Sequence, residues 1–166
     1  MPIIPWKLNS ATKADAATFM GVFRNGLENL MPIDYRHKNA LAARTMIEEM
    51  TAVPKTAILI DRAPNSSESH GIVVIRNAPP ILQILFLCVQ SEVWRKGHGT
   101  QLVKAVQALG EKHGLSEIRI KYCPKDERAA EFVASAGFSV VGEAGEAARG
   151  FPLVEAALKL TAGAPD

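Results

Sequence analysis

Two glycines with cationic neighbours are the residues of this chain whose types and spacing most clearly indicate chemistry. The stretch consists of Arg95, Lys96, Gly97, His98, Gly99 and Thr100. Glycine adopts positive φ readily and lets a ligand approach the backbone closely. The first N–H groups of a helix lack intrahelical partners and, with the helix dipole, they favour an anion. We therefore predict a phosphate-binding turn here, with Arg95 and Lys96 adding charge, Thr100 adding a hydroxyl, and His98 facing solvent or the ligand.

Two common phosphate-binding motifs do not fit this stretch. A P-loop requires GxxxxGK[ST], which the chain lacks. The dinucleotide fingerprint requires a third glycine where the chain has Leu102. The local pattern alone leaves open a tight turn with a solvated basic rim.

The elements that must position this turn can be read from the hydrophobic pattern. Three apolar runs, residues 56–60, 71–75 and Ile81–Val89, predict consecutive, mostly antiparallel strands. The third is apolar at nearly every position, so we expect it at the centre of the sheet, covered on both faces. Apolar residues at helical spacing predict a helix over residues 100–112, which ends at His113 and Gly114.

The flanking regions complete a mixed α and β pattern. Before residue 54 we expect an edge strand at residues 3–8 and two helices, the second over residues 38–50. After residue 114 we expect a strand over residues 115–123, a helix capped by Asp126 that runs to residue 136, and a final pair of strands over residues 138–141 and 154–160. The fold class is α/β in the broad sense, α+β in detail, in a single domain of residues 1–166.

Composition excludes several functional classes. The chain has 166 residues, 48% hydrophobic and 22% charged, with a net charge of +2, which is ordinary for a globular protein and does not indicate a nucleic-acid partner. Cys88 and Cys123 lack metal-ligand spacing, so no metal is expected. No secretory signal is recognisable near the start, and the longest apolar run is too short to span a bilayer. We expect a cytoplasmic protein without membrane partners.

A second motif gives the turn a context. The segment DERAAEFVASAGF, residues 126–138, follows the turn after one helix and one strand. Together the two segments resemble the signatures of the GCN5-related N-acetyltransferase (GNAT) superfamily, written (R/Q)xxGx(G/A) and NxxAxxFYxxxGF. Val89 corresponds to the valine that ends the family's central strand. The resemblance is strongest over residues 72–138 and implies a central mixed, mostly antiparallel sheet of six to seven strands flanked by about four helices.

The resemblance implies acetyl-CoA or another acyl-CoA as co-substrate. Its pyrophosphate would bind the backbone N–H groups of residues 96–100, and Asp126 would belong to the same site. Its pantetheine arm would pair with Leu87, Cys88 and Val89, with an amide near Leu87 binding the thioester oxygen. The acceptor implied is a primary amine of a small molecule or peptide, and a homodimer is allowed for because dimers are common in that family.

Three departures from the family pattern concern the chemistry. Trp94 stands at the position of the motif's first arginine or glutamine, Asp126 replaces asparagine, and Val133 replaces the tyrosine that protonates the departing thiolate. We name Tyr122 as the first candidate for that proton donor, with Cys123 and Ser135 as weaker alternatives.

A general base is not obvious either. Gln83 is the only polar residue of the central strand, and an amide is not a base. Glu28 is the candidate base, with Asp34 and His37 nearby in sequence, and transfer through water stays open. The sequence thus predicts an N-acetyltransferase that uses direct attack by the amine, with a catalytically inactive CoA-binding or interaction protein as the alternative.

Overall fold

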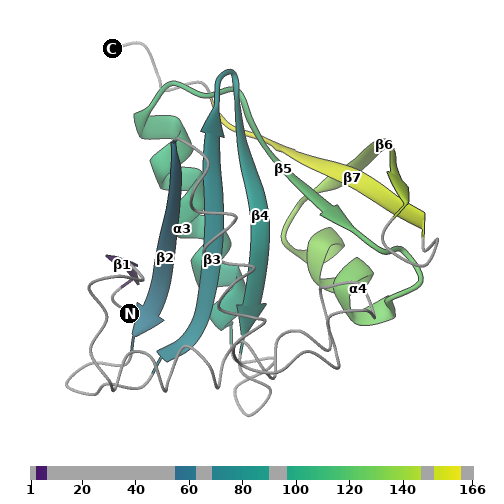
Figure 1. The fold of residues 1–166 in the computed structure, drawn as a ribbon, viewed down its shortest axis with the longest axis horizontal. Helices are drawn as coiled ribbons and strands as arrows, with labels where there is room; N and C mark the ends of the chain where they lie inside the picture. The colour runs from purple at the N-terminus through teal and green to yellow at the C-terminus, as the bar shows by residue number, and fades with distance from the viewer. Residues whose placement is uncertain (1–2, 7–54, 63–68, 90–96, 147–151, 162–166) are drawn as a thin grey trace.

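A computed structural model describes residues 3–6, 55–62, 69–89, 97–146 and 152–161 of the chain. These residues form seven strands and two helices (Figure 1). The strands are β1 (Ile3–Trp6), β2 (Thr56–Arg62), β3 (Ser69–Ala78), β4 (Ile81–Val89), β5 (Glu117–Tyr122), β6 (Ser139–Glu146) and β7 (Pro152–Lys159). The helices are α3 (His98–Lys112) and α4 (Glu127–Ser135).

All seven strands belong to one sheet with the order β1-β2-β3-β4-β5-β7-β6. Only β4 and β5 are parallel, and every other neighbouring pair is antiparallel. A parallel pair needs a crossover connection, and α3 provides it here. The sheet therefore consists of two antiparallel parts, β1-β2-β3-β4 and β5-β7-β6, which are joined by the parallel pair of β4 and β5.

Helix α3 packs against the sheet through one apolar stripe. Its buried side chains Leu102, Val103 and Val106 follow helical spacing, so they lie on one face. They belong to a hydrophobic cluster that also contains Val73 of β3, Ile84 of β4 and the α4 residues Ala129 and Val133. One core thus holds both helices against the strands that flank the β4–β5 junction.

Most predicted elements are confirmed with small shifts of their ends. The central position of β4 in the sheet is confirmed, and so is the edge position of β1. Coverage of β4 on both faces is only partial, because Leu82, Ile84 and Leu87 are buried whereas Ile81 and Gln83 are half-buried. The two predicted helices before residue 54 lie outside the described residues. Neither described helix is long and apolar enough to cross a bilayer.

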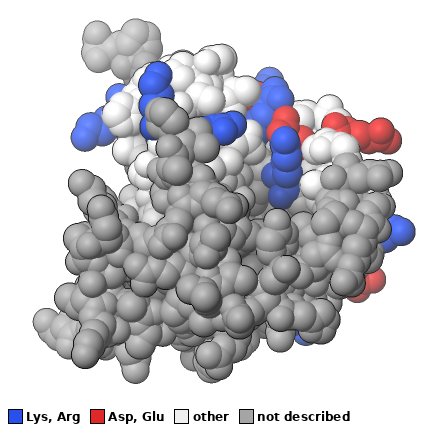
Figure 2. Space-filling view, viewed as in Figure 1, with Lys and Arg blue, Asp and Glu red and all other residues white. Residues whose placement is uncertain are grey.

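Both signs of charge occur on the surface in Figure 2. Acidic and basic side chains lie next to each other over the described part of this face, on the side of β5, β6 and β7. Close mixing of opposite charges leaves no extended field of one sign on this part of the surface.

Candidate functional site

The most distinctive feature of the sheet is a fork between β4 and β5. The two strands pair only from Ile81 with Glu117 to Ile84 with Ile120. Beyond that point β4 continues in register with β3 as far as Val89, while β5 continues in register with β7 as far as Tyr122. Figure 1 shows the two strands diverging toward their carboxyl ends. The edge of β4 that faces β5 therefore has no β-ladder from Leu85 onward among the described strands.

A β-bulge in β4 lies at the start of the fork. Ile75 pairs with Ile84, whereas its neighbour Val74 pairs with Phe86, so Leu85 is an extra residue in β4. A bulge bends its strand and increases the local twist. The bulge thus gives a local reason why β4 turns away from β5 directly after their last pair.

The amino end of α3 is the second part of the site. Gly97 is the N-cap residue, has φ +89°, and makes no side-chain capping hydrogen bond. The first helical bond runs from Gln101 N–H to Gly97 O at 2.9 Å. The N–H groups of His98, Gly99 and Thr100 precede it, and such groups have no partner within their own helix. The helix also has no acidic residue in its first turn, so this end suits an anion.

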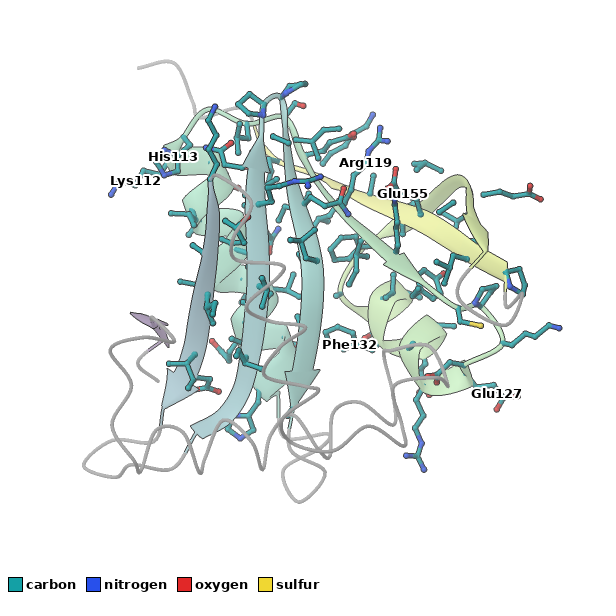
Figure 3. All side chains as sticks on the ribbon, viewed as in Figure 1. Lys112, His113, Arg119, Glu127, Phe132 and Glu155 are labelled. Carbon is teal, nitrogen blue, oxygen red and sulfur yellow. The ribbon has the colours of Figure 1, made fainter. Side chains whose placement is uncertain are left out.

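Gly99 lacks the positive φ that its sequence context suggested, and its predicted contact with a cofactor stays a prediction. Positive φ is found at Gly97 but not at Gly99. A Cβ placed on Gly99 would lie 2.7 Å from Cε2 of Phe132, which belongs to α4. Figure 3 shows Phe132 projecting from α4 toward β4. Gly99 therefore permits close contact between the two helices, and the predicted positive φ at this position was wrong.

His98 also departs from its prediction. We expected it to face solvent or the ligand, but its side chain is 9% exposed and its Nδ1 lies 2.9 Å from Oδ2 of Asp61 on β2. A carboxylate only accepts hydrogen bonds, so Nδ1 carries a proton and donates it. The sequence analysis did not select Asp61. The available signal was an acidic residue directly after the apolar run of β2.

The candidate proton donors lie near the other branch of the fork. Tyr122 ends β5 and is 6% exposed, within the hydrophobic cluster that also contains Val133 of α4. Cys123 is a free, half-buried thiol directly after Tyr122. The hydroxyl of Ser135 donates to the carbonyl of Phe132 at 2.9 Å, so its proton is already used within α4. Val133 fills core space, and its side chain has no proton to donate.

Gln83 holds the two strands together just before they diverge. Its Nε2 donates to Arg119 O of β5 at 3.2 Å and to Ile84 O at 3.4 Å. Arg119 in turn donates to Glu155 of β7 at 2.8 Å and to Glu117 at 2.6 Å. These bonds, to Glu155 above all, raise the pKa of Arg119 above its ordinary value. Gln83 therefore has a structural partner at the fork, which agrees with its exclusion as a base.

Asp126 performs the capping role that its position predicted. Its Oδ1 accepts hydrogen bonds from the backbone N–H groups of Arg128 and Ala129, each at 3.2 Å. This bonding fixes the start of α4. Its predicted contact with a cofactor stays a prediction.

Several predicted site residues cannot be placed. Glu28, Arg95 and Lys96 lie outside the described residues, as do Asp34 and His37. Of Cys88 only the backbone is described, as part of β4 beside Leu87 and Val89. The structure brings the turn at Gly97, the part of β4 that follows its last pair with β5, and the end of β5 to the carboxyl ends of the parallel strand pair.

Comparisons with known proteins agree on one family. The model of the acetyltransferase (GNAT) family matches residues 40–138. The structure of an aminoglycoside 6′-acetyltransferase type Ii superposes with a TM-score of 0.73 at 18% identity, covering 97% of this chain and 98% of that one. An aminoglycoside 6′-N-acetyltransferase complexed with coenzyme A gives 0.69 at 15%, with 97% and 98% covered.

A protein-modifying enzyme is among the similar structures as well. The ribosomal-protein-S18-alanine N-acetyltransferase from Escherichia coli gives a TM-score of 0.66 at 14% identity, covering 99% of this chain and 97% of that one. Identities this low show a common fold and no more. No curated protein matches the chain at a significant level.

Proposed function

Because the chain belongs to the acetyltransferase (GNAT) family, we propose that it transfers an acyl group from acetyl-CoA, or another acyl-CoA, to a primary amine. The observation that carries this proposal is the fork between β4 and β5 beside the α3 terminus that lacks a side-chain cap. The fork offers backbone hydrogen-bonding groups to an extended chain. The helix terminus offers N–H groups to an anion. An acyl-CoA has both parts, an extended pantetheine arm and a pyrophosphate.

The residues of the chain fit such a co-substrate at both ends. The N–H groups of His98, Gly99 and Thr100 would bind the pyrophosphate, and Thr100 is exposed at this end. The backbone of Leu87, Cys88 and Val89 would bind the pantetheine arm along the β4 edge. A similar structure was solved as a complex with coenzyme A, and it covers nearly this whole chain. That complex supports an acyl-CoA as the co-substrate here.

The acyl thioester supplies an activated carbonyl. Residues of this chain must help to remove a proton from the amine and to protonate the departing thiolate. A backbone amide near Leu87 would stabilise negative charge on the thioester oxygen. Tyr122 and Cys123 end β5 on the opposite branch of the fork and are the candidates for protonating the thiolate. Glu28, the candidate base, comes from the sequence alone. With Ser135 bonded within α4, we place Tyr122 and Cys123 before it.

The chemical identity of the acceptor amine has the least direct support from the structure. The similar structures include enzymes named for aminoglycosides and one named for an alanine of ribosomal protein S18. We propose a primary amine of a small molecule or of a peptide as acceptor.

A second candidate function has its own supporting observation. Val133 occupies the position of the family's tyrosine, and its side chain is 2% exposed within the core. A protein that binds CoA without turnover would need no proton donor there. Such a protein would bind a partner or sense acyl-CoA.

One pair of measurements separates the two functions. Isothermal titration with acetyl-CoA tests the co-substrate, and absence of binding at millimolar concentration would exclude both. Thiol release from acetyl-CoA over a panel of amines and peptides tests turnover. Acceptor-dependent release supports the transferase, whereas binding without release across the panel supports the binding protein. Loss of release in Tyr122→Phe, with binding retained, would assign the donor.

A further inference from the structure

A buried carboxylate lies under the proposed pyrophosphate site. Asp61, on β2, is fully buried, and its Oδ2 accepts the hydrogen bond from His98 Nδ1 at 2.9 Å. The other oxygen, Oδ1, has no hydrogen-bond partner within the described part of the chain. On β3 the residue opposite Asp61 is Gly71, which is buried and has no side chain. At this register the side chain of Asp61 therefore meets no side chain from β3.

Fold stability does not explain an acidic residue at this position. Removing a carboxylate from water is costly, and a buried ion pair is often no more stabilising than apolar side chains of similar volume. The unpartnered Oδ1 adds to that cost. The other buried residues of β2, Ile58 and Ile60, are aliphatic. A pair of apolar residues in place of Asp61 and His98 would serve the core at least as well.

The partner of Asp61 has a special position in the chain. His98 is the first residue of α3 and follows Gly97, which provides no side-chain cap. Its imidazole is tied to β2 through Asp61. The next residue, Gly99, is packed against Phe132 of α4. The first turn of α3 is thus held on two sides, by a directional polar contact with β2 and by an apolar contact with α4.

We propose that Asp61 is a positioning residue of the co-substrate site. It orients His98 and so fixes the N–H groups of the first turn of α3 toward the pyrophosphate. A hydrogen bond sets the rotation of the imidazole, which apolar packing alone specifies less strictly. This inference rests on the proposed function, since it concerns how the same site holds its ligand.

The test compares two substitutions of Asp61 by calorimetric titration with CoA. Asp61→Val removes the bond to His98 and should weaken CoA binding about tenfold, the order of loss when a binding group is slightly misplaced. Asp61→Asn keeps an oxygen that accepts from Nδ1–H, so it should retain most of the affinity. Titration with pantetheine, which lacks the pyrophosphate, should give the same affinity for the wild type and Asp61→Val.

A matched control separates positioning from stability. Ile60→Val removes one methylene group from Ile60, the buried neighbour of Asp61 in β2. This substitution leaves the hydrogen bond between Asp61 and His98 in place. We expect both variants to lower the melting temperature, Asp61→Val because it leaves the buried Nδ1 of His98 without its carboxylate partner, whereas only Asp61→Val should lower the CoA affinity.

The possible failures are distinguishable. If the wild type does not bind CoA, the proposed function is wrong and this inference fails with it. If the wild type binds CoA and Asp61→Val binds it equally well, only the positioning role is overturned. An equal loss for CoA and pantetheine in Asp61→Val would indicate a general disturbance of the fork and would also overturn it.

Discussion

The two described helices begin in opposite ways. Helix α4 is capped by Asp126, whose carboxylate accepts from Arg128 N–H and Ala129 N–H, and its first turn contains Glu127. Helix α3 begins at Gly97 with no side-chain cap and no acidic residue in its first turn. Helix α4 thus carries acidic side chains at its own positive end, whereas the cap and first turn of α3 carry none, and Asp61 of β2 is bonded to the imidazole of His98.

The difference supports the anion site proposed at the first turn of α3. Gly99 in the first turn of α3 lies against Phe132 in the second half of α4, and both helices belong to one core. What distinguishes them is the supply of negative charge. The comparison predicts that substitutions in the first turn of α3 change ligand affinity and that the matched substitution Glu127→Gln in α4 changes only stability.

The largest effect is expected where the two helices meet. Gly99→Ala places a Cβ 2.7 Å from a ring carbon of Phe132, and such overpacking costs about 1–3 kcal/mol. Gly99→Glu adds a negative charge to the same clash, so we expect loss of CoA binding as well. Chemical denaturation measures the first effect and calorimetric titration the second.

A double-mutant cycle checks the cause of this loss. Phe132→Leu shortens the side chain opposite Gly99, so the stability loss of Gly99→Ala/Phe132→Leu should be smaller than the sum of the single losses. Full stability of Gly99→Ala alone would contradict the packing role of Gly99.

The next effect should have opposite signs for stability and for binding. Thr100 is exposed in the first turn of α3. Thr100→Glu supplies the negative charge that α3 lacks, so it should stabilise the protein by about 0.3–1 kcal/mol. The same charge should weaken CoA binding by about tenfold, or about 1.4 kcal/mol. Thr100→Gln introduces a side chain of the same size as glutamate without its charge, so it should change neither the stability nor the CoA affinity. An unchanged CoA affinity in Thr100→Glu would exclude the pyrophosphate from this terminus.

A smaller effect is expected at the cap of α4. Asp126→Ala removes the acceptor of two backbone N–H groups, which costs about 1 kcal/mol of unfolding free energy. Asp126→Asn retains an accepting oxygen, so its unfolding free energy should stay close to that of the wild type. Equal stability of the alanine and asparagine variants, measured by urea denaturation, would show that the cap does not matter.

The smallest effect concerns the acidic residue in the first turn of α4. Glu127→Gln keeps the length of the side chain and removes its charge from the helix terminus, at a cost of about 0.3 kcal/mol or more at low ionic strength. Salt screens such exposed charges. The difference between Glu127→Gln and the wild type should therefore shrink as salt is added, and a difference independent of salt would point to a lost specific contact instead.

Much of the architecture could be predicted because it depends on local patterns. The run Ile81–Val89 is apolar throughout, and its bounds agree with β4 as observed. Helix α4 was recognised from Asp126 and the spacing of Ala129 and Val133, which are the residues that cap and bury it. The early helices and Glu28 lie outside the described residues, so the predictions for them stay predictions.

The site was predicted in part, and the misses share one cause. Gly97 with positive φ was expected from the turn. The reason for Gly99 was not, because Phe132 is distant in the chain and meets it only through the packing of α4 on α3. The contact between Asp61 and His98 joins residues 37 positions apart. No spacing rule connects them.

Local patterns in the sequence specify the order of the elements and the glycine turn, since these follow from periodicity, capping and backbone freedom over a few residues. The folded structure alone shows that β4 leaves β5 after Ile84 and that His98 is bonded to a buried acid. Those features depend on which distant surfaces meet when the core forms. The turn thus indicates a ligand from local chemistry, while the groups that orient the turn and act beside it come from remote parts of the chain.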